Sequence, residues 1–186
     1  MKIGVISDTH GCSATWEKIY DQYLYDADFI IHAGDVLYHG PRNPVLPEYN
    51  PSRLAEALNA CPVPFIVAAG NCDSEVDSMV LDIPVQSPYS YAIVNDLRIL
   101  VTHGQNQTEE KLFALAQQVK ADLIITGHTH IAALKQQNGV THLNPGSPVS
   151  GLSKQVDQHG TLAIVTNRKI SVIDIDAGKI IMEESI

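Results

Sequence analysis

Side chains that can bind metal ions recur directly after apolar segments of this sequence. The residues are Asp8, His10, Asp35, Asn71, His103, His128 and His130. A single aspartate or histidine at such a place is typically a turn former or a hydrogen-bonded structural residue. All of them together would crowd carboxylates and imidazoles without compensation, which is costly for buried polar groups. Metal ions would supply the compensating charge, so the pattern predicts a metal site.

The spacing and chemistry of these residues indicate which metals fit. In an extended segment alternate side chains share one side, so Asp8 with His10, and His128 with His130, could each chelate a single ion. Carboxylate, imidazole and carboxamide donors without thiolate suit manganese, iron, cobalt, nickel or zinc better than calcium. The set is too large for one catalytic ion with an open position, so we expect two ions that share a carboxylate.

The segments that must position these residues are predicted strands. They are residues 2–7, 28–33, 63–69, 97–104 and 122–127. Helical spacing begins at Ser13, at Pro51 and at Thr108, and only strands and turns follow from Ala132 onward. Residues that follow parallel strands converge at one edge of a sheet. The pattern predicts an α/β sandwich, two packed mixed sheets with helices outside, in a single domain over residues 1–186.

Composition limits the classes of partner. The chain carries 12 basic and 21 acidic residues, a net charge of −9, and its basic residues are scattered, which argues against long nucleic acid and acidic membranes. It has neither a membrane-length apolar run nor a signal-like start, so we expect a cytoplasmic protein that does not bind membranes. Three cysteines without metal spacing suit free thiols.

Five short motifs resemble those of the calcineurin-like metallophosphoesterases, in the same order. They are DTHG (8–11), GDV (34–36), GNCD (70–73), THG (102–104) and GHTH (127–130), followed by NPGS (144–147). Within that family, HGPRN (39–43) and GNCDSEVD (70–77) resemble the small YfcE-type bacterial phosphodiesterases. The resemblance implies that Asp8, His10 and His130 bind a first metal. It implies that Asn71, His103 and His128 bind a second, and that Asp35 bridges the two.

The resemblance also implies an activity, the hydrolysis of a small phosphodiester by a hydroxide that bridges two divalent ions. Manganese is the expected metal, and zinc, iron, nickel and cobalt stay open. Cys72 stands where the wider family has a histidine. Because a thiol donates a proton less readily than an imidazolium, we expect a preference for good leaving groups such as aryl esters. The YfcE resemblance and the lower charge of a diester favour diesters over monoesters at a site that lacks a cationic imidazole. The alternative for Cys72 is a small buried thiol beside a turn.

Three further residues are candidate catalytic groups. His39 and Arg42 lie on a proline-stiffened loop beyond Asp35, from which either could reach a phosphate oxygen; the alternative is a pair that stabilises the loop. Asp73 is expected to orient a neighbouring group, or else to form a turn after Asn71. The remaining histidines, His32, His142 and His159, are interpreted as core, sheet and surface residues.

Two other functions compete with this one. A non-catalytic metal-binding scaffold or interaction module of the same fold is the main alternative, although the complete ligand set disfavours it. A nuclease is disfavoured by the acidic balance and by the lack of a basic or aromatic groove. Relatives of the YfcE type also suggest a homo-oligomer, for which exposed strands in the second half of the chain offer a route.

Overall fold

A seven-stranded mixed sheet forms one half of the molecule in the computed structural model, which describes residues 1–152 and 159–186. Its strands, in order across the sheet, are β12 (Lys179–Ser185), β11 (Lys169–Asp174), β10 (Thr161–Thr166), β1 (Lys2–Ile6), β2 (Phe29–His32), β3 (Phe65–Ala68) and β4 (Val85–Gln86). Strands β1 to β4 are parallel, and β10 to β12 add an antiparallel extension beside β1. The short edge strand β4 is an element that the sequence pattern did not predict.

A five-stranded mixed sheet packs against the first. Its order is β5 (Ser90–Val94), β6 (Leu97–Val101), β7 (Leu123–Ile125), β9 (Val140–Pro145) and β8 (Ala132–Gln137). Strands β5 and β6 form a hairpin with the turn at Asn95 and pair in antiparallel register, while β6, β7 and β9 are parallel. Apolar side chains from both sheets, among them Ile3, Ile31, Ile99 and Leu123, form the core between them.

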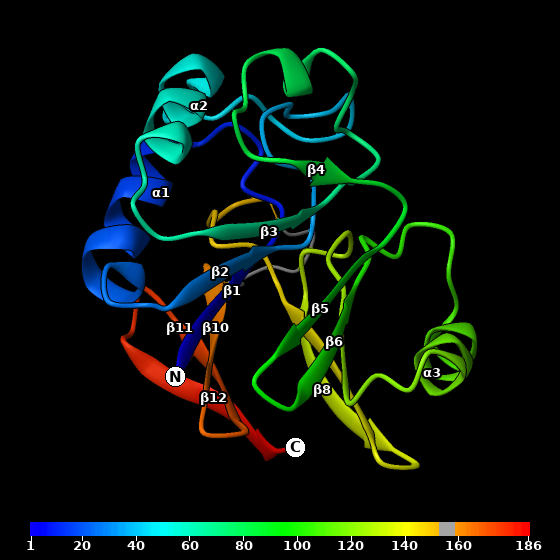
Figure 1. Ribbon diagram of the computed structural model, residues 1–186. Coiled ribbons are helices and arrows are strands. Elements are labelled where there is room, and N and C mark those ends of the chain that lie inside the picture. The colour runs from blue at the N-terminus through cyan, green and yellow to red at the C-terminus, as the bar shows by residue number, and fades with distance from the viewer. Residues whose placement is uncertain (153–158) are drawn as a thin grey trace.

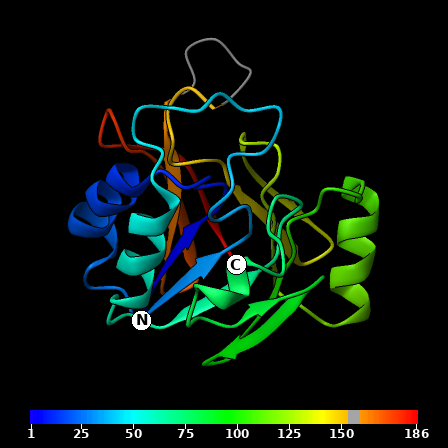
Figure 2. The same cartoon turned by 90° about the horizontal axis from the view of Figure 1, so that it is seen from above.

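Helices cover the outer faces of the two sheets. They are α1 (Ser13–Ile19), which continues as the π-helical turn η1 (Tyr20–Leu24), α2 (Pro51–Asn59) and α3 (Glu109–Gln118). The 3-10 turn η2 (Asp77–Met79) lies in the connection between β3 and β4. Figure 2 shows α1 and α2 on one side of the sheets and α3 on the other. The side chain of Thr108, where the helical spacing begins, caps α3 by accepting a hydrogen bond from the Lys111 N–H. The predicted α/β sandwich is therefore confirmed.

The loops that carry the candidate residues come together at one edge of both sheets. The described parallel strands β1, β2 and β3 deliver the loops that begin at residues 7, 33 and 69, and β6 and β7 deliver those that begin at 102 and 126 (Figure 1). These are the carboxyl ends of parallel strands, where open α/β sheets bind their ligands. Among the described residues, no helix is long and apolar enough to cross a membrane.

Candidate metal centre

The backbone at the candidate ligands is unusual. Five of them lie in the left-handed region, with φ of +57° at Asp8, +43° at His10, +58° at Asp35, +71° at His128 and +60° at His130. Such conformations cost non-glycine residues about 1–2 kcal/mol each and cluster at functional sites. The expectation that Asp-x-His and His-x-His lie in extended segments is therefore wrong, because both motifs turn through left-handed residues immediately after their strands.

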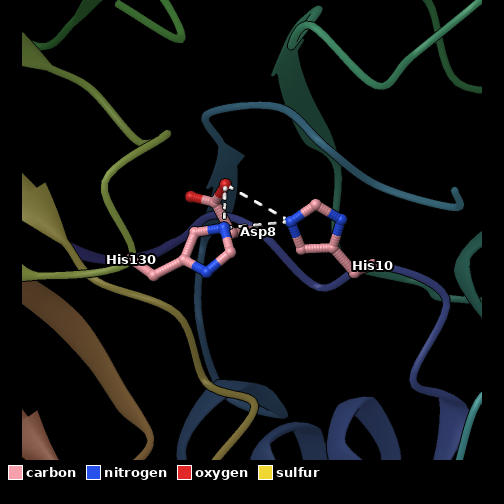
Figure 3. Close-up of side chains that lie close together, drawn as sticks. All are labelled: Asp8, His10 and His130. Carbon is pink, nitrogen blue, oxygen red and sulfur yellow. Dashed lines mark hydrogen bonds and ion pairs between the residues drawn. The ribbon is translucent and has the colours of Figure 1, made fainter. Parts of the chain in front are cut away.

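Asp8, His10 and His130 form the first cluster, although His130 is 120 residues distant in the sequence. Figure 3 shows the two imidazoles turned toward the Asp8 carboxylate. Asp8 Oδ1 lies 3.7 Å from His10 Nε2 and 3.3 Å from His130 Nε2, and the two ring nitrogens are 3.1 Å apart. One buried oxygen and two nitrogens thus face a common point, which is the arrangement expected of ligands to one ion.

Asp35 and His103 extend this cluster on its other side. Asp35 Oδ2 lies 3.2 Å from His103 Nε2 and 3.7 Å from His10 Nε2, and Asp8 Oδ1 is 3.8 Å from His103 Nε2. Asp35 therefore faces one histidine on each side, as a shared ligand must. Its other oxygen, Oδ1, accepts a hydrogen bond from the Cys72 N–H at 2.7 Å.

Backbone carbonyls orient three of the rings. Nδ1 lies 2.8 Å from the Tyr38 carbonyl oxygen in His10, 2.7 Å from that of Ala33 in His103, and 3.2 Å from that of Leu152 in His130. A carbonyl can only accept, so Nδ1 carries the proton in each ring. In the neutral ring Nε2 then presents its lone pair to the carboxylates. Metal-binding histidines have this same outer hydrogen bond, which sets both tautomer and orientation.

These lone pairs and carboxylates need a positive charge between them. Asp8 Oδ1 and His103 Nε2 are buried, and neither atom has a hydrogen-bond partner among the described residues. Burial opposes ionisation of Asp8, yet the nearby His10, His130 and His103 hold the pKa of its carboxyl far below the usual range. Burial likewise opposes charging of His103, but Asp35 and Asp8 raise the pKa of this ring to about 9. A divalent cation bound by the lone pairs fits this environment.

Asn71 and His128 lie at the edge of these clusters. His128 is half-buried, its ring packs edge-on against His103 at 5.3 Å between centroids, and its backbone N–H donates to Asp8 Oδ2 at 3.0 Å. Burial and the neighbouring His103 lower the pKa of His128. Asn71 is exposed beside Cys72. His128 packs against His103 and His130 against His10, an arrangement that favours separate ions over one ion chelated by both.

Asp73 joins two of the loops. Its carboxylate accepts hydrogen bonds from the backbone N–H groups of Asp35 at 2.8 Å, Val36 at 2.7 Å and Gly70 at 2.7 Å. The approach is close, since a Cβ on Gly70 would lie 2.1 Å from Asp35 Oδ1. Asp73 thus holds the backbone on which Asp35 stands. Burial raises the pKa of Asp73 despite these donors.

The NPGS segment secures two further loops. Ser147 Oγ donates to the Asp8 carbonyl at 2.8 Å, and Asn144 Nδ2 donates to the Gly127 carbonyl at 2.7 Å. A Cβ on Gly127 would lie 1.9 Å from Ser7 Oγ, so only glycine lets these loops meet. The sequence assigned no role to this motif. Its role in holding the loops depends on contacts between segments that are distant in the sequence.

The remaining candidates lie around a cleft of about 1260 Å³ that opens from the metal centre. Arg42 and Cys72 line it, and burial together with Asp35 raises the pKa of the Cys72 thiol to about 12. His39 is not among the lining residues; its ring packs against Tyr38 and Tyr49, with centroids 4.6 and 5.1 Å away. This placement favours the loop-stabilising alternative for His39.

Two residues that the sequence did not single out also touch the centre. Asn43 Nδ2 lies 3.3 Å from His10 Nε2, and it donates to the His39 carbonyl at 2.8 Å. Tyr38 supplies the carbonyl that orients His10. Asn43 lies within HGPRN, so its position in that motif was the available signal. The Tyr38 contact uses only the backbone carbonyl, which any residue type could supply, so the sequence could not predict it.

Comparisons with known proteins agree with the fold and the motifs. Residues 1–169 match the profile of the calcineurin-like phosphoesterase superfamily domain. Phosphodiesterase YfcE of Escherichia coli (strain K12) is 35% identical over 187 aligned residues, which span 100% of this chain and 98% of the relative. The solved structure of Yfce, a phosphoesterase from E. coli, matches with a TM-score of 0.84 at 33% identity over the whole of both chains. Vacuolar Protein Sorting 29 from Cryptosporidium parvum has the same fold, with a TM-score of 0.71 at 18% identity over 100% of this chain and 98% of that one.

Proposed function

This chain belongs to the calcineurin-like phosphoesterase superfamily, and we propose that it is a divalent-metal-dependent phosphodiesterase acting on small diesters. The observation that carries the proposal is the set of imidazoles locked by backbone carbonyls, with Nε2 turned toward two buried aspartates. The relative that is 35% identical over essentially its whole length is named a phosphodiesterase, which supports the same reaction class.

In this proposal two groups of ligands hold two ions. Asp8, His10 and His130 bind the first, and the second takes Asn71, His103 and His128. Asp35 would be shared by the two groups, which its distances of 3.2 Å to His103 Nε2 and 3.7 Å to His10 Nε2 support. Oxygen and imidazole donors suit manganese, and zinc, iron, nickel or cobalt fit the same set. When bound, such ions neutralise phosphate charge and lower the pKa of water.

The protein's own side chains then position the phosphate group and select among substrates. Arg42 lines the cleft, where its guanidinium is expected to pair with a phosphate oxygen. The Cys72 thiol stays protonated and neutral near neutral pH, because its pKa is raised to about 12. A site that lacks a cationic imidazole at this position stabilises less negative charge, so we expect diesters, which carry less charge than monoesters, and good leaving groups.

The test is hydrolysis of bis-p-nitrophenyl phosphate and p-nitrophenyl phosphate by metal-stripped protein, with and without Mn²⁺. We expect metal-dependent turnover, with the diester preferred, that is lost in Asp35→Asn. A folded protein that turns over neither ester with any of the five candidate metals would refute the enzyme and favour a non-catalytic interaction module.

Position 72 has its own test. If the neutral thiol sets the substrate preference, Cys72→His should raise turnover of the monoester relative to the diester. Identical ester preferences in the two proteins would show that position 72 does not limit the chemistry.

A further inference from the structure

The cleft is much larger than a phosphate group requires. Its volume of about 1260 Å³ exceeds the range of about 300–1,000 Å³ that is usual for small-molecule sites. Asp35, Asn71, His128 and His130 line one end of it, so it is continuous with the metal centre. Whatever binds at the metals therefore has a long, open space beside it, which the reaction at phosphorus does not use.

The far walls of this space come from two separate segments and carry apolar side chains among polar ones. Helix α2 contributes Ala55, while Val76 and Val80 flank the turn η2 on the opposite side. Val76 is 59% exposed and Val80 50% exposed, although both are apolar, and both face the cleft. Leu37 and Tyr49 also line it. Ala55 and Leu37 are each only 5% exposed, so a ligand group would gain free energy mainly by removing the apolar surface of Val76 and Val80 from water.

The charges around the cleft exclude a second anionic group at its far end. Among the described residues that line the cleft, Arg42 is the one lysine or arginine. The far side instead carries the exposed carboxylate of Glu56 on α2. Asp77 also lines the cleft, where its side chain accepts a hydrogen bond from the Ser74 N–H at 2.9 Å. A second phosphate would therefore meet negative charge, whereas an uncharged ring could cover the exposed side chains of Val76 and Val80.

We propose that the cleft between α2 and the segment 74–80 is a specificity site that receives an uncharged, ring-sized organic group of the phosphodiester substrate. This inference rests on the proposed function, because the metal centre must hold the phosphate of the same molecule. The substrate class that it names is a phosphodiester with a bulky, uncharged substituent and no additional phosphate. Val76 and Val80 determine the specificity for that group.

The experiment compares two diesters that release the same leaving group, methyl p-nitrophenyl phosphate and phenyl p-nitrophenyl phosphate, with Mn²⁺-loaded protein. The ratio of kcat/KM for the phenyl ester to that for the methyl ester is expected to be about tenfold or more, because the ring buries apolar surface. In Val80→Asp and Val76→Asp, a carboxylate on the apolar wall should reduce this ratio by about tenfold.

Met79→Asp is the matched control. Met79 lies in the same turn and is 74% exposed, but it does not line the cleft, so this variant adds the same charge nearby and should keep the wild-type ratio. Glu56→Lys tests the reverse change of charge. It should raise kcat/KM for 4-carboxyphenyl p-nitrophenyl phosphate relative to kcat/KM for the phenyl ester. If wild type, Val76→Asp and Val80→Asp all hydrolyse both esters with the same phenyl-to-methyl ratio of kcat/KM, the specificity site is refuted and the proposed function stands. Absence of metal-dependent turnover would overturn the proposed function and this inference together.

Discussion

Two groups of buried histidines in this protein differ in what their ring nitrogens face. His10, His103 and His130 are proposed ligands, and we call them the metal-centre histidines. Each donates from Nδ1 to a backbone carbonyl and turns Nε2 toward a buried aspartate. His32, by contrast, accepts a hydrogen bond from the Gly34 N–H at Nδ1, and its Nε2 lies 2.9 Å from the Thr9 hydroxyl. Burial alone therefore does not mark a ligand; a carboxylate opposite the lone pair does.

The pKa shifts of His103 and His32 are opposite. Burial opposes charging of both rings, but the pKa of His103 is raised to about 9 by Asp35 and Asp8, while the pKa of His32 falls to about 4. His142 follows His32, because burial lowers its pKa and its Nε2 lies 2.8 Å from the Thr126 hydroxyl. We call His32 and His142 the packing histidines. The carboxylates of the metal centre thus favour a positive charge at His103, whereas burial keeps the packing histidines neutral.

The largest expected effect comes from exchanging one histidine of each kind for glutamine. His103→Gln removes a proposed ligand and should lower kcat/KM for bis-p-nitrophenyl phosphate by about 10³-fold or more, equivalent to about 4 kcal/mol. His142→Gln, on the outer face of the five-stranded sheet against Phe113, should cost stability but keep activity per folded molecule. The measurement is steady-state hydrolysis with Mn²⁺, normalised to folded protein by circular dichroism. Equal losses of activity per folded molecule in the two variants would contradict the distinction between metal-centre and packing histidines.

Acid should reveal His32 as a packing histidine. Its pKa is about 4 in the folded protein against an ordinary value of 6.5, so between these pH values the unfolded chain binds a proton that the folded chain does not. Stability from this group is complete above pH 6.5 and declines as the pH falls toward 4, by about 3 kcal/mol in total. Urea unfolding in EDTA at pH 7 and pH 5 should show a smaller loss in His32→Gln than in wild type. Parallel pH profiles would mean that the ring is protonated in the folded state.

Metal binding should stabilise the fold through the metal-centre histidines. Mn²⁺ at about 100 times its Kd contributes about 2.7 kcal/mol to a protein that binds it only when folded. For a chain of this size that corresponds to a rise in Tm of about 5–10 °C over the EDTA-treated protein, measured by calorimetry. Asp35→Asn should lose most of this shift, and His142→Gln should keep it. A wild-type Tm that is unchanged by Mn²⁺ would argue against a metal site in this cluster.

Much of the fold and the members of the site were accessible from the sequence. The apolar segments 2–7, 28–33 and 122–127 predicted strands of parallel type, and polar residues after such strands must meet at one edge. That geometric rule brought Asp8 and His130 together across most of the chain without any knowledge of loop structure.

What could not be predicted depends on contacts whose partners are backbone atoms or distant loops. The carbonyls of Ala33 and Leu152 orient metal-centre histidines, and any residue type could supply them. The left-handed backbone at Asp8 and His130 replaced the extended segments that the spacing suggested, because hydrogen bonds between loops, such as the Asp8 N–H to the Gly34 carbonyl at 2.9 Å, hold them there. The cleft also depends on how residues 74–80 pack opposite α2, which has no local sequence signal.

The smallest expected effect separates two aspartates that both accept backbone hydrogen bonds. Asp73 accepts from the N–H groups of Asp35, Val36 and Gly70, within the loops of the metal centre, whereas Asp77 accepts from Ser74 outside it. Asp73→Asn places an amide donor against those N–H groups, so it should weaken Mn²⁺ binding by about 10–100-fold through displacement of Asp35. Asp77→Asn should lose stability but keep the Mn²⁺ affinity, measured by titration calorimetry at one pH. If both variants bind Mn²⁺ as wild type does, the position of Asp35 does not depend on Asp73, and the centre is held by the histidine contacts alone.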